Sequence, residues 1–479
     1  MAEAPKTRRY LRRRGSNEIT YEHVHGDPDL EVKVESRTFR VHKVVLIHTC
    51  GYFDAMLECG MRESLENYVD LQGFDADAFE IILDFLYSPE PVVIDENLDY
   101  ILELANFLQV HPLLQYMKGK VNKGNCVHLY ILADAYNAIE LKEVAGDIIT
   151  RNYYKFLRTE DFKRLLPEQQ DELLQARFNH RKYLGAINNG YVFWPEPGPR
   201  ELMKYDEKKD TWSTFASKPD DTPSRGFAVA ALDNYIYIAG GHGKPRSGHH
   251  ASGLGDPQHT VYTYNPLSSE WAEVCPLGEA RAFFGFIQYK ARLYAIGGFH
   301  FDYGVQSVER YDPLQDKWTY LEPLPNFATD YGMAVVCKDD IYISSEDYDT
   351  SIFSLMKYSP VWDEWEVVSE LPRERDRHCM ASVNDVIYIL GGHVPGVDCY
   401  DVSTNQWSVL EEHPATESIS YDKGCGVKDG VIYVLNHEDT VSYITDSETW
   451  VQGLTPFPGG FYLSMAFEVY LPEKNDECK

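Results

Sequence analysis

"SVERYDPLQDKWTYLEPLP" (307–325) places a tyrosine seven residues before a tryptophan, with an Asp-Pro turn between them. The same spacing recurs along the chain, at Tyr205 and Trp212, Tyr264 and Trp271, Tyr358 and Trp365, Tyr400 and Trp407, and Tyr443 and Trp450. Between these pairs lie apolar alternating segments such as "ARLYAIGG" (291–298) and "DVIYILGG" (385–392), which predict short strands that end in tight turns. A repeat of about 40 to 50 residues with several such strands is typical of a β-propeller blade. We therefore expect the recurring Tyr and Trp to pack as scaffold, with binding residues in the loops.

The charge of the chain limits its partners. The 479 residues suffice for two or three domains and include 45 Lys and Arg against 75 Asp and Glu, a net charge of −30. Residues 183–479 hold 22 basic and 45 acidic residues, so the repeat region alone carries −23. Such an acidic body disfavours binding to nucleic acid.

Targeting signals and cysteines indicate the compartment. The sequence has no apolar stretch of about 18 residues and no apolar region behind its Arg-rich amino end, so we expect neither a membrane span nor a secretory signal. The nine cysteines include no Cys-x-x-Cys pair, which argues against a disulfide framework or a zinc module. We expect a cytoplasmic protein without metal, cofactor or membrane partner. The basic segment "KTRRYLRRR" (6–14) leaves nuclear import open, and the alternative is a solvated, disordered tail.

The first part of the chain has the pattern of a small mixed α/β domain. "DLEVKVESRTFRVHKVVL" (29–46) alternates around a polar turn and predicts a hairpin, and "YVDL" (68–71) predicts a third strand. Apolar residues at helical spacing predict one helix behind Asp75, a candidate N-cap, and another behind Asp95. Residues 122–182 predict three or four short amphipathic helices.

These segments carry a family resemblance. The segments that match a BTB (POZ) domain are "FRVHKVVL" (39–46), "YFDAMLECGMRES" (52–64) and "FEIILDFLYSPE" (79–90). The helical segment resembles a shortened BACK domain, and the repeats resemble a six-bladed kelch propeller. The resemblance therefore implies an α/β domain, a short α-helical segment and an all-β propeller. The expected boundaries are a basic, disordered tail over 1–26, the BTB domain over 27–121, the BACK-like segment over 122–182, the propeller over 183–470 and a tail over 471–479.

The propeller is expected to close through its carboxyl end. The first blade begins midway, at "GYVFW" (190–194), without a first strand of its own, whereas "FYLSMAFEVY" (461–470) is a strand that nothing follows. Pairing these two segments removes exposed sheet edges. Two blades carry Ser344-Ser345 and Leu435-Asn436 in place of the Gly pair, so altered turns are expected there.

The order BTB, BACK and kelch resembles the substrate adaptors of cullin-3 ubiquitin ligases. The resemblance implies a non-catalytic chain whose BTB domain dimerises and binds cullin-3, while the propeller captures a protein substrate. It places the cullin contact at Met61, Arg62 and Glu63, where Met61 fills an apolar groove and Glu63 fixes the local geometry. Two alternatives stay open: a cytoskeletal scaffold whose dimerised propellers bind filaments, and a copper oxidase, an activity found on some kelch propellers.

Polar and aromatic side chains precede the first strand of several blades, where the loops of kelch propellers frame the substrate pocket. On this resemblance we predict a substrate site lined by Arg225, Arg281, Tyr331, Arg377, His378 and Tyr421. Arginines there suit a peptide with carboxylates, and the alternative is that they form ion pairs with nearby Asp and Glu. The insertion 242–259 carries His242, His249, His250 and His259, and its Gly-rich sequence favours a mobile binding or spacer loop over a metal site.

Overall fold

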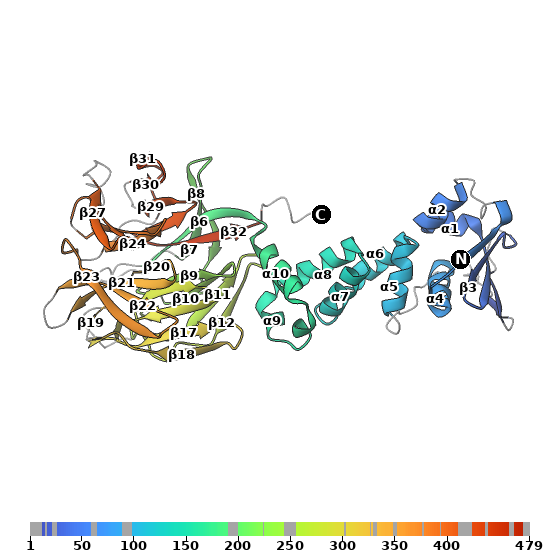
Figure 1. The fold of residues 1–479 in the computed structure, drawn as a ribbon, viewed down its shortest axis with the longest axis horizontal. Helices are drawn as coiled ribbons and strands as arrows, with labels where there is room; N and C mark the ends of the chain where they lie inside the picture. Colours follow the sequence, from blue (N-terminus) through green and yellow to red (C-terminus); the bar gives the residue numbers. More distant parts are fainter. Residues whose placement is uncertain are drawn as a thin grey trace, which may run out of the picture. The chain divides into compact units, whose positions relative to one another are not determined.

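The structure is a computed structural model whose contacts divide the chain into two compact units, Met1–Leu173 and Leu174–Lys479 (Figure 1). It describes residues 12–14, 17–21, 26–58, 65–88, 98–189, 200–223, 225–243, 255–300, 303–325, 327–328, 333–347, 352–375, 378–392, 394–410, 424–435, 439–458 and 464–472. In these ranges, no helix has both the length and the apolar character that crossing a membrane requires.

The amino-terminal unit contains a five-stranded sheet with the order β1-β2-β4-β3-β5. Its strands are β1 (Arg12–Arg14), β2 (Glu18–Tyr21), β3 (Leu30–Val34), β4 (Arg37–Val41) and β5 (Tyr68–Leu71). β3 and β4 form the predicted antiparallel hairpin, and β5 joins β3 in parallel. Alternate residues of the hairpin, among them Val32, Val34 and Phe39, are buried, as the two-residue period of a strand requires.

Strands β1 and β2 both lie within residues 1–26, for which a disordered tail is predicted, so this prediction is wrong for residues 12–14 and 18–21. β2 pairs in parallel with β4, with Ile19 opposite Phe39. Ile19 and Tyr21 are buried, and the Tyr21 hydroxyl donates to Asp84 at 2.8 Å. The alternation of Ile19 and Tyr21 is a strand signal that the basic composition of this end conceals.

Helices follow the hairpin and continue to the end of this unit. They are α1 (Lys43–Thr49), α2 (Gly51–Glu58), α4 (Ala76–Tyr87), α5 (Leu98–Phe107), α6 (His111–Lys120), α7 (Cys126–Ala135), α8 (Ile139–Arg151), α9 (Tyr153–Leu157), η1 (Phe162–Arg164) and α10 (Pro167–Gln175). Asp75 caps α4 as predicted, because its carboxylate accepts the N–H of Ala78 at 2.8 Å. The ring of Phe79 in α4 meets Phe39 of the sheet edge-on at 5.1 Å. Asp95, behind which the other helix is predicted, lies outside the described residues.

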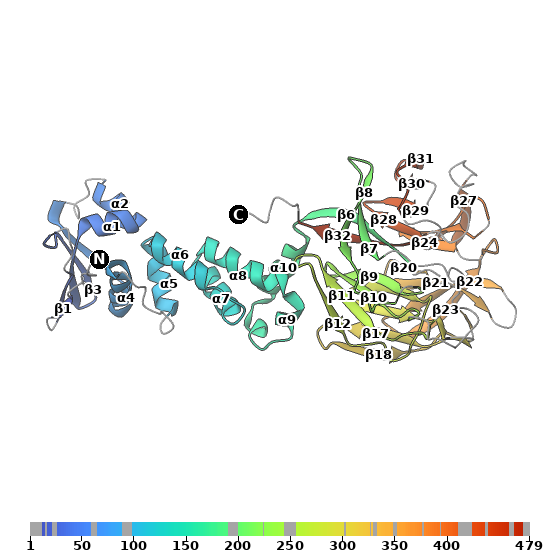
Figure 2. The same ribbon diagram turned by 180° about the vertical axis from the view of Figure 1, so that it is seen from behind.

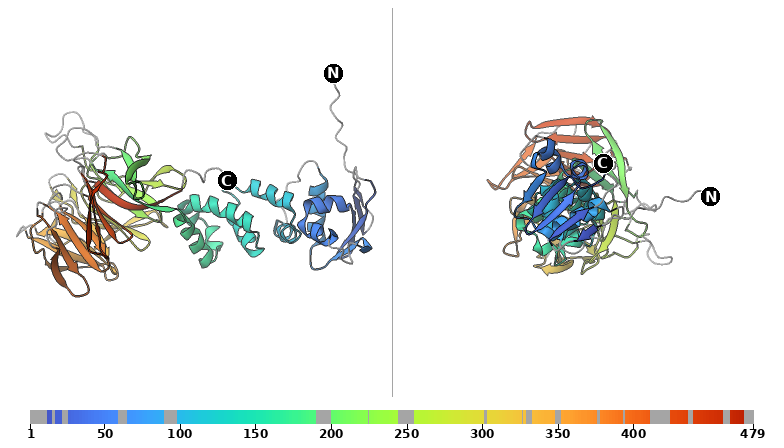
Figure 3. Two further views of the ribbon diagram at one scale, coloured as in Figure 1. Left: turned by 90° about the horizontal axis from the view of Figure 1, so that it is seen from above. Right: turned by 90° about the vertical axis from the view of Figure 1, so that its right-hand side faces the viewer.

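The carboxyl-terminal unit consists of antiparallel sheets that follow one another around an axis, as the colour sequence shows in Figures 2 and 3. From the innermost strand outward, the sheets are blade 1 with β32 (Ser464–Leu471), β6 (Arg181–Asn188), β7 (Glu201–Asp206) and β8 (Thr211–Ser217); blade 2 with β9 (Ala228–Leu232), β10 (Tyr235–Ala239), β11 (Val261–Asn265) and β12 (Glu270–Val274); blade 3 with β13 (Gly285–Tyr289), β14 (Arg292–Ile296), β17 (Val308–Asp312) and β18 (Lys317–Leu321); blade 4 with β20 (Ala334–Cys337), β21 (Asp340–Asp347), β22 (Phe353–Ser359) and β23 (Glu364–Glu370); blade 5 with β24 (His378–Val383), β25 (Val386–Gly391), β26 (Val397–Asp401) and β27 (Gln406–Leu410); and blade 6 with β28 (Gly424–Lys428), β29 (Val431–Leu435), β30 (Thr440–Ile444) and β31 (Thr449–Leu454). The innermost strands contact one another in a closed cycle, β9 to β13, β20, β24, β28, β32 and back to β9. The described residues therefore form the predicted six-bladed propeller.

The recurring Tyr and Trp lie opposite each other in the outer hairpin of every blade, with ring centroids 4.8 to 5.1 Å apart. In blade 3, Trp318 Nε1 donates to the Cys275 carbonyl of blade 2 at 2.9 Å. The Tyr311 hydroxyl donates to Asp316 at 2.6 Å, and Asp316 also accepts the Cys275 N–H at 3.1 Å. The unit quoted at the start thus joins its blade to the preceding one, which confirms its predicted role as scaffold.

The ring closes through the carboxyl-terminal strand, as predicted. β32 pairs antiparallel with β6, from Ser464 opposite Asn188 to Leu471 opposite Arg181. The side chain of Asn234, in the turn between β9 and β10, donates to the Tyr470 carbonyl and accepts the Tyr470 N–H, both at 2.9 Å. Blade 2 therefore also holds the closing strand. The segment "GYVFW" lies outside the described residues, and the strand that meets β32 precedes it in the sequence.

The chain contacts the propeller before the predicted start at residue 183. Arg177 lies in the short helix η2 (Ala176–Phe178) and is fully buried. Its guanidinium donates to the carbonyls of Asp233 at 2.6 Å and Asn234 at 3.1 Å, and lies 3.8 Å from the centroid of the Tyr235 ring. These contacts place η2 in the carboxyl-terminal unit.

The Gly pairs end the second strands of blades 2, 3 and 5 in backbone conformations that favour glycine. Gly298 has φ +97°, and a Cβ there would lie 2.7 Å from the Ala282 carbonyl oxygen. In blade 4, where Ser344 and Ser345 replace the pair, β21 continues to Asp347 and its end pairs with the short strand β19 (Phe327–Ala328). The altered turn expected in blade 4 is thus an extension of the strand.

One position at the junction between blades 1 and 2 breaks the repeat. Six residues after the recurring tryptophan, blades 2, 3 and 4 place Leu277, Leu324 and Leu371. Each leucine N–H bonds to a carbonyl at or just before the start of the third strand of its blade. The equivalent N–H in blade 1 belongs to Lys218, which bonds to the Arg200 carbonyl at 3.0 Å. Lys218 is 2% exposed, so blade 1 buries a lysine side chain at the position where blades 2, 3 and 4 have a leucine.

Candidate functional site: the entry face of the propeller

We call the end of the propeller at which the innermost strands begin the entry face. It is formed by the loops before the innermost strands and the loops between the second and third strands, among them the described residues 277–284, 297–300, 303–307, 371–375 and 394–396. Because neighbouring strands are antiparallel, both kinds of loop meet at the same end of each blade. Most of the residues predicted to bind a substrate belong to these loops.

The side chain of Arg281 is buried in an ion-pair network, which corrects its prediction as a substrate anchor. Its side chain is fully buried, and its Nη2 forms an ion pair with Glu309 at 2.7 Å. Nη1 donates to the carbonyls of Gly297 at 2.9 Å and Ser307 at 2.8 Å. Glu309 also accepts the N–H of Gly278 at 2.6 Å. Arg281 is therefore the core of a network that fixes the loops of blade 3, as the ion-pair alternative anticipated.

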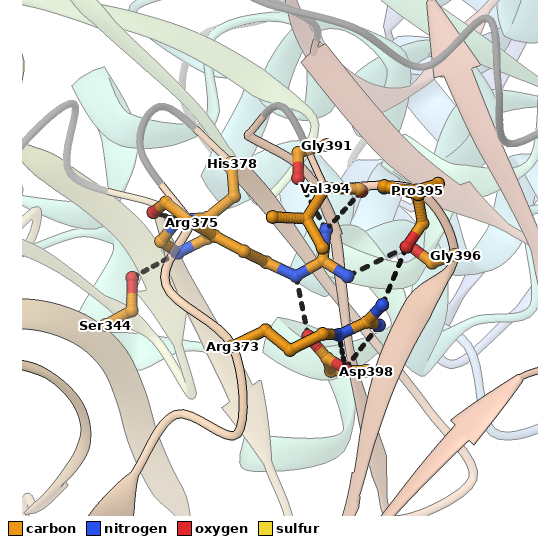
Figure 4. Close-up of polar contacts among 9 residues, drawn as sticks. All are labelled: Ser344, Arg373, Arg375, His378, Gly391, Val394, Pro395, Gly396 and Asp398. Atoms are coloured by element: carbon orange, nitrogen blue, oxygen red, sulfur yellow. Dashed lines mark hydrogen bonds and ion pairs between the residues drawn. The ribbon is translucent and has the colours of Figure 1, made fainter.

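Blade 5 contains an equivalent network around Arg375, which the sequence analysis did not select (Figure 4). Arg375 is fully buried and its Nε donates to Asp398 at 2.6 Å. Its guanidinium also donates to the carbonyls of Gly391, Val394 and Gly396, so it holds the whole turn between β25 and β26. Arg373 binds the other oxygen of Asp398 through Nε at 2.7 Å.

His378 is brought to the entry face but is packed between two blades (Figure 4). Its Nε2 lies in hydrogen-bond contact with the Ser344 hydroxyl of blade 4, and its Nδ1 contacts the Arg375 carbonyl at 2.8 Å. The residue is 8% exposed. His378 thus links the extended strand of blade 4 to the arginine network of blade 5. Its contacts give it a structural role in place of the predicted one in the wall of a pocket.

Arg225 is also buried and lies between blades 2 and 3. Its carbonyl accepts the N–H of His242 at 2.7 Å, and the His242 ring lies 5.8 Å from that of Phe283. Burial lowers the pKa of His242, and the charges of Arg225 and His300 add to this effect. Phe283 has φ +53°, an uncommon conformation for an aromatic residue, and its N–H bonds to the Gly226 carbonyl at 2.8 Å. The predicted anchor is therefore part of a packed junction.

The remaining predicted site residues lie outside the described residues. They are Tyr331, Arg377 and Tyr421 on the propeller and Met61, Arg62 and Glu63 on the amino-terminal unit. In the insertion 242–259, residues 244–254 with His249 and His250 lie outside as well. Within the described part of the chain, no three His, Cys, Asp or Glu side chains gather in a way that could hold a metal ion.

A cavity of about 720 Å³ follows the axis between the innermost strands. Most of its lining residues are apolar, among them Met333, Met380 and Met465, and Phe178 of η2 also lines it. The buried arginines of blades 3 and 5 do not line it. The charged groups that shape the entry face therefore lie away from the axis, over the middle strands of the blades.

Two features of the sequence predict the arginine networks of blades 3 and 5. Blades 3 and 5 share the pattern Val-acid-x-Tyr-Asp in their third strands, "VERYD" (308–312) and "VDCYD" (397–401). The other blades place Met203, Tyr262, Met356 and Val441 where these two have Glu309 and Asp398. Each acid is accompanied by an arginine, Arg281 or Arg375. This arginine stands four residues after the leucine that follows the preceding blade, Leu277 or Leu371. The pairing of arginine and acid in only two blades thus predicts their ion pairs.

Comparison with known families gives three matches. A BTB/POZ domain model matches residues 25–143, a model named BTB And C-terminal Kelch matches 126–177, and a Kelch motif model matches 223–277, 280–325 and 374–414. The Kelch motif matches fall on blades 2, 3 and 5, which are the blades that retain the Gly pair.

Curated proteins with similar sequences are kelch proteins. Kelch-like protein 42 of Mus musculus is 28% identical over 298 residues, which cover 56% of this chain and 59% of that protein. The Homo sapiens protein of the same name is 28% identical over 310 residues, with 56% and 60% covered. Kelch domain-containing protein 7A of Mus musculus is 33% identical over 180 residues, with 37% and 22% covered. The chain thus spans about three fifths of the length of the Kelch-like proteins it matches.

Proposed function

Because the chain belongs to the BTB-kelch family, we propose that it is a substrate-recognition subunit of a cullin-3 ubiquitin ligase and performs no catalysis itself. In this proposal the BTB unit forms a homodimer and binds cullin-3, and the propeller captures a protein for ubiquitination in the cytoplasm. The observation that supports it is the presence of a BTB/POZ domain and a closed propeller in one chain. Such a chain joins a docking module to a rigid scaffold whose loops are free to vary.

The proposed cullin contact is the segment of Met61, Arg62 and Glu63. It follows α2, in which Phe53 and Met56 are buried against the domain core. A methionine presented beyond this anchored helix suits an apolar groove, since its unbranched thioether side chain adapts to irregular surfaces. Two copies on a homodimer would bind two cullin molecules and gain avidity for bivalent targets.

We test this with the purified full chain and cullin-3, with affinity measured by interferometry and mass by light scattering. Met61→Ala combined with Glu63→Ala is expected to weaken cullin-3 binding at least tenfold, or about 1.4 kcal/mol, and to leave the dimer mass unchanged. Lys33→Ala is the control, because this residue is half-buried on β3 and its side chain only approaches Asp70 at 3.8 Å.

The outcomes separate the parts of the proposal. Binding that survives the double substitution refutes the assigned contact, and a wild-type chain that does not bind cullin-3 refutes the ligase role. A monomeric mass at micromolar concentration refutes the homodimer. Co-sedimentation of the wild-type chain with actin filaments in the absence of cullin-3 binding would favour the cytoskeletal scaffold instead.

A further inference from the structure

Blades 3 and 5 contain equivalent ion clusters of opposite net charge. In blade 3, one guanidinium, that of Arg281, is surrounded by the carboxylates of Glu309 and Glu279, the latter linked through the Ser307 hydroxyl. In blade 5, the two guanidiniums of Arg373 and Arg375 share the single carboxylate of Asp398. The two clusters therefore carry formal charges of −1 and +1.

The difference comes from one position. Glu279 stands two residues before Arg281, and Arg373 stands two residues before Arg375, so the arginine of blade 5 replaces the acid of blade 3. Asp398 is buried, with 1% of its side chain exposed, and it cannot neutralise both arginines. Glu374 lies between the two arginines in the sequence, but it is exposed and forms no ion pair with the residues that the structure describes. The positive charge of this cluster thus has no fixed counterion in the described residues.

Arg373 presents this charge at the surface. Its side chain is 27% exposed, whereas that of Arg375 is fully buried. Nε and Nη2 donate to Asp398, and Nη1 donates to the Pro395 carbonyl at 2.7 Å. A guanidinium has five N–H groups, so two remain after these three contacts. The guanidinium lies over Gly396, where an added Cβ would meet Nη1 at 3.5 Å.

We propose that Arg373 anchors an anionic side chain, a carboxylate or a phosphate, of the protein substrate on the entry face over blade 5. The proposal rests on the proposed function and names the substrate class of its propeller. Asp398 and Pro395 hold the guanidinium in one orientation, so little side-chain freedom is lost when it binds a partner. Hydrogen bonds between a guanidinium and an anion are among the strong ones, and the acidic propeller offers few competing cations. The surplus charge thus makes this part of the entry face selective for an acidic segment.

The test selects peptides on the full chain from a phage library of random 12-residue sequences. The wild-type chain is expected to enrich peptides with Asp and Glu. Arg373→Glu is expected to bind the enriched peptides at least tenfold more weakly, and Arg373→Lys, which keeps the charge but not the planar fork, to bind with intermediate affinity. Arg373→Glu gives blade 5 the same formal charges as the cluster of blade 3, one guanidinium and two carboxylates. Enriched peptides with one acid changed to phosphoserine or alanine then tell whether a carboxylate or a phosphate is preferred.

Arg292→Ala is the matched control, because Arg292 is 35% exposed and forms one ion pair, with Asp312 at 3.0 Å. It should leave peptide binding unchanged. A selection without acidic enrichment, or equal binding of the enriched peptides by wild type and Arg373→Glu, overturns the proposal. Cullin-3 binding is measured on the same variants. If the wild-type chain does not bind cullin-3, the ligase role is refuted. Selective binding of acidic peptides would still establish the Arg373 subsite in that case.

Discussion

Replacing Lys218 by methionine tests how a buried lysine affects the stability of the propeller. Lys218 stands where blades 2, 3 and 4 have a leucine, and in the described residues it has no carboxylate partner. Its Nζ donates to the Pro223 carbonyl at 2.5 Å and lies 4.2 Å from the centroid of the Phe227 ring. Burial, together with the charge of Arg200, lowers the pKa of Lys218 to about 7. Methionine keeps the volume of the side chain and removes the charge.

The magnitude follows from this pKa. Lowering it from 10.5 to about 7 corresponds to about 5 kcal/mol at about 1.4 kcal/mol per pH unit, the cost of burying the charged form. The methionine variant gives up the bond to Pro223 and the contact of the cation with Phe227, together worth about 2 kcal/mol. Below pH 7 we therefore expect Lys218→Met to raise the free energy of unfolding by about 3 kcal/mol.

The sign of the pH dependence is fixed by linkage. Between pH 7 and 10.5 the unfolded lysine is protonated while the folded one is neutral, so the unfolded state binds more protons and the stability of the wild type rises with pH. The advantage of Lys218→Met is thus complete below pH 7 and disappears as pH approaches 10.5. All eight tryptophans lie between residues 194 and 450, so their fluorescence during urea unfolding reports on the propeller alone.

Lys428 provides the matched control. It is also buried, but its Nζ contacts both Glu207 and Asp429 at 2.9 Å, and their hydrogen bonds and charges raise its pKa despite burial. Lys428→Met should therefore lower the stability at neutral pH, and its effect should fade as pH rises above 10.5. If Lys218→Met is less stable than the wild type at pH 6, the hydrogen bond and the ring contact outweigh the burial of charge, and the reasoning fails.

Two further predictions concern the scaffold. Arg281→Ala leaves Glu309 buried without its cation and should lower the free energy of unfolding by about 3 to 5 kcal/mol, whereas Arg281→Met combined with Glu309→Leu should recover most of the loss; a single variant as stable as the double one in urea unfolding would show that the ion pair is not structural. Trp318→Phe keeps an aromatic ring against Tyr311 but removes the donor to the Cys275 carbonyl, so we expect a loss of about 1 kcal/mol, and no loss would argue against this bond as a link between blades 2 and 3.

The sequence predicted those features that depend on local periodicity. The hairpin of residues 30–41, the cap at Asp75, the six blades and the closing strand all follow from alternation, spacing and one unpartnered segment, because each is encoded within a short window. The predicted roles of Arg225, Arg281 and His378 depended instead on where a side chain points. An arginine beside a strand is compatible with an open mouth or a buried ion pair, and only the position of Glu309 across the blade decides between them.

The positions that depart from the repeat distinguish residues that can recognise a partner from residues that maintain the propeller. Blade 1 lacks its own innermost strand and is completed by β32, and blade 4 lacks the Gly pair and lengthens β21, so both keep the ring closed by local compensation. Arg281 and Arg375 are equivalent and buried because the repeat fixes the position of each beside its acid. Residue 373 lies outside this constraint, since the same position in blade 3 holds the acid Glu279 without a change of fold. A position that holds either sign of charge at the edge of a rigid network can change the choice of partner without changing the fold, and that freedom is what a recognition residue requires.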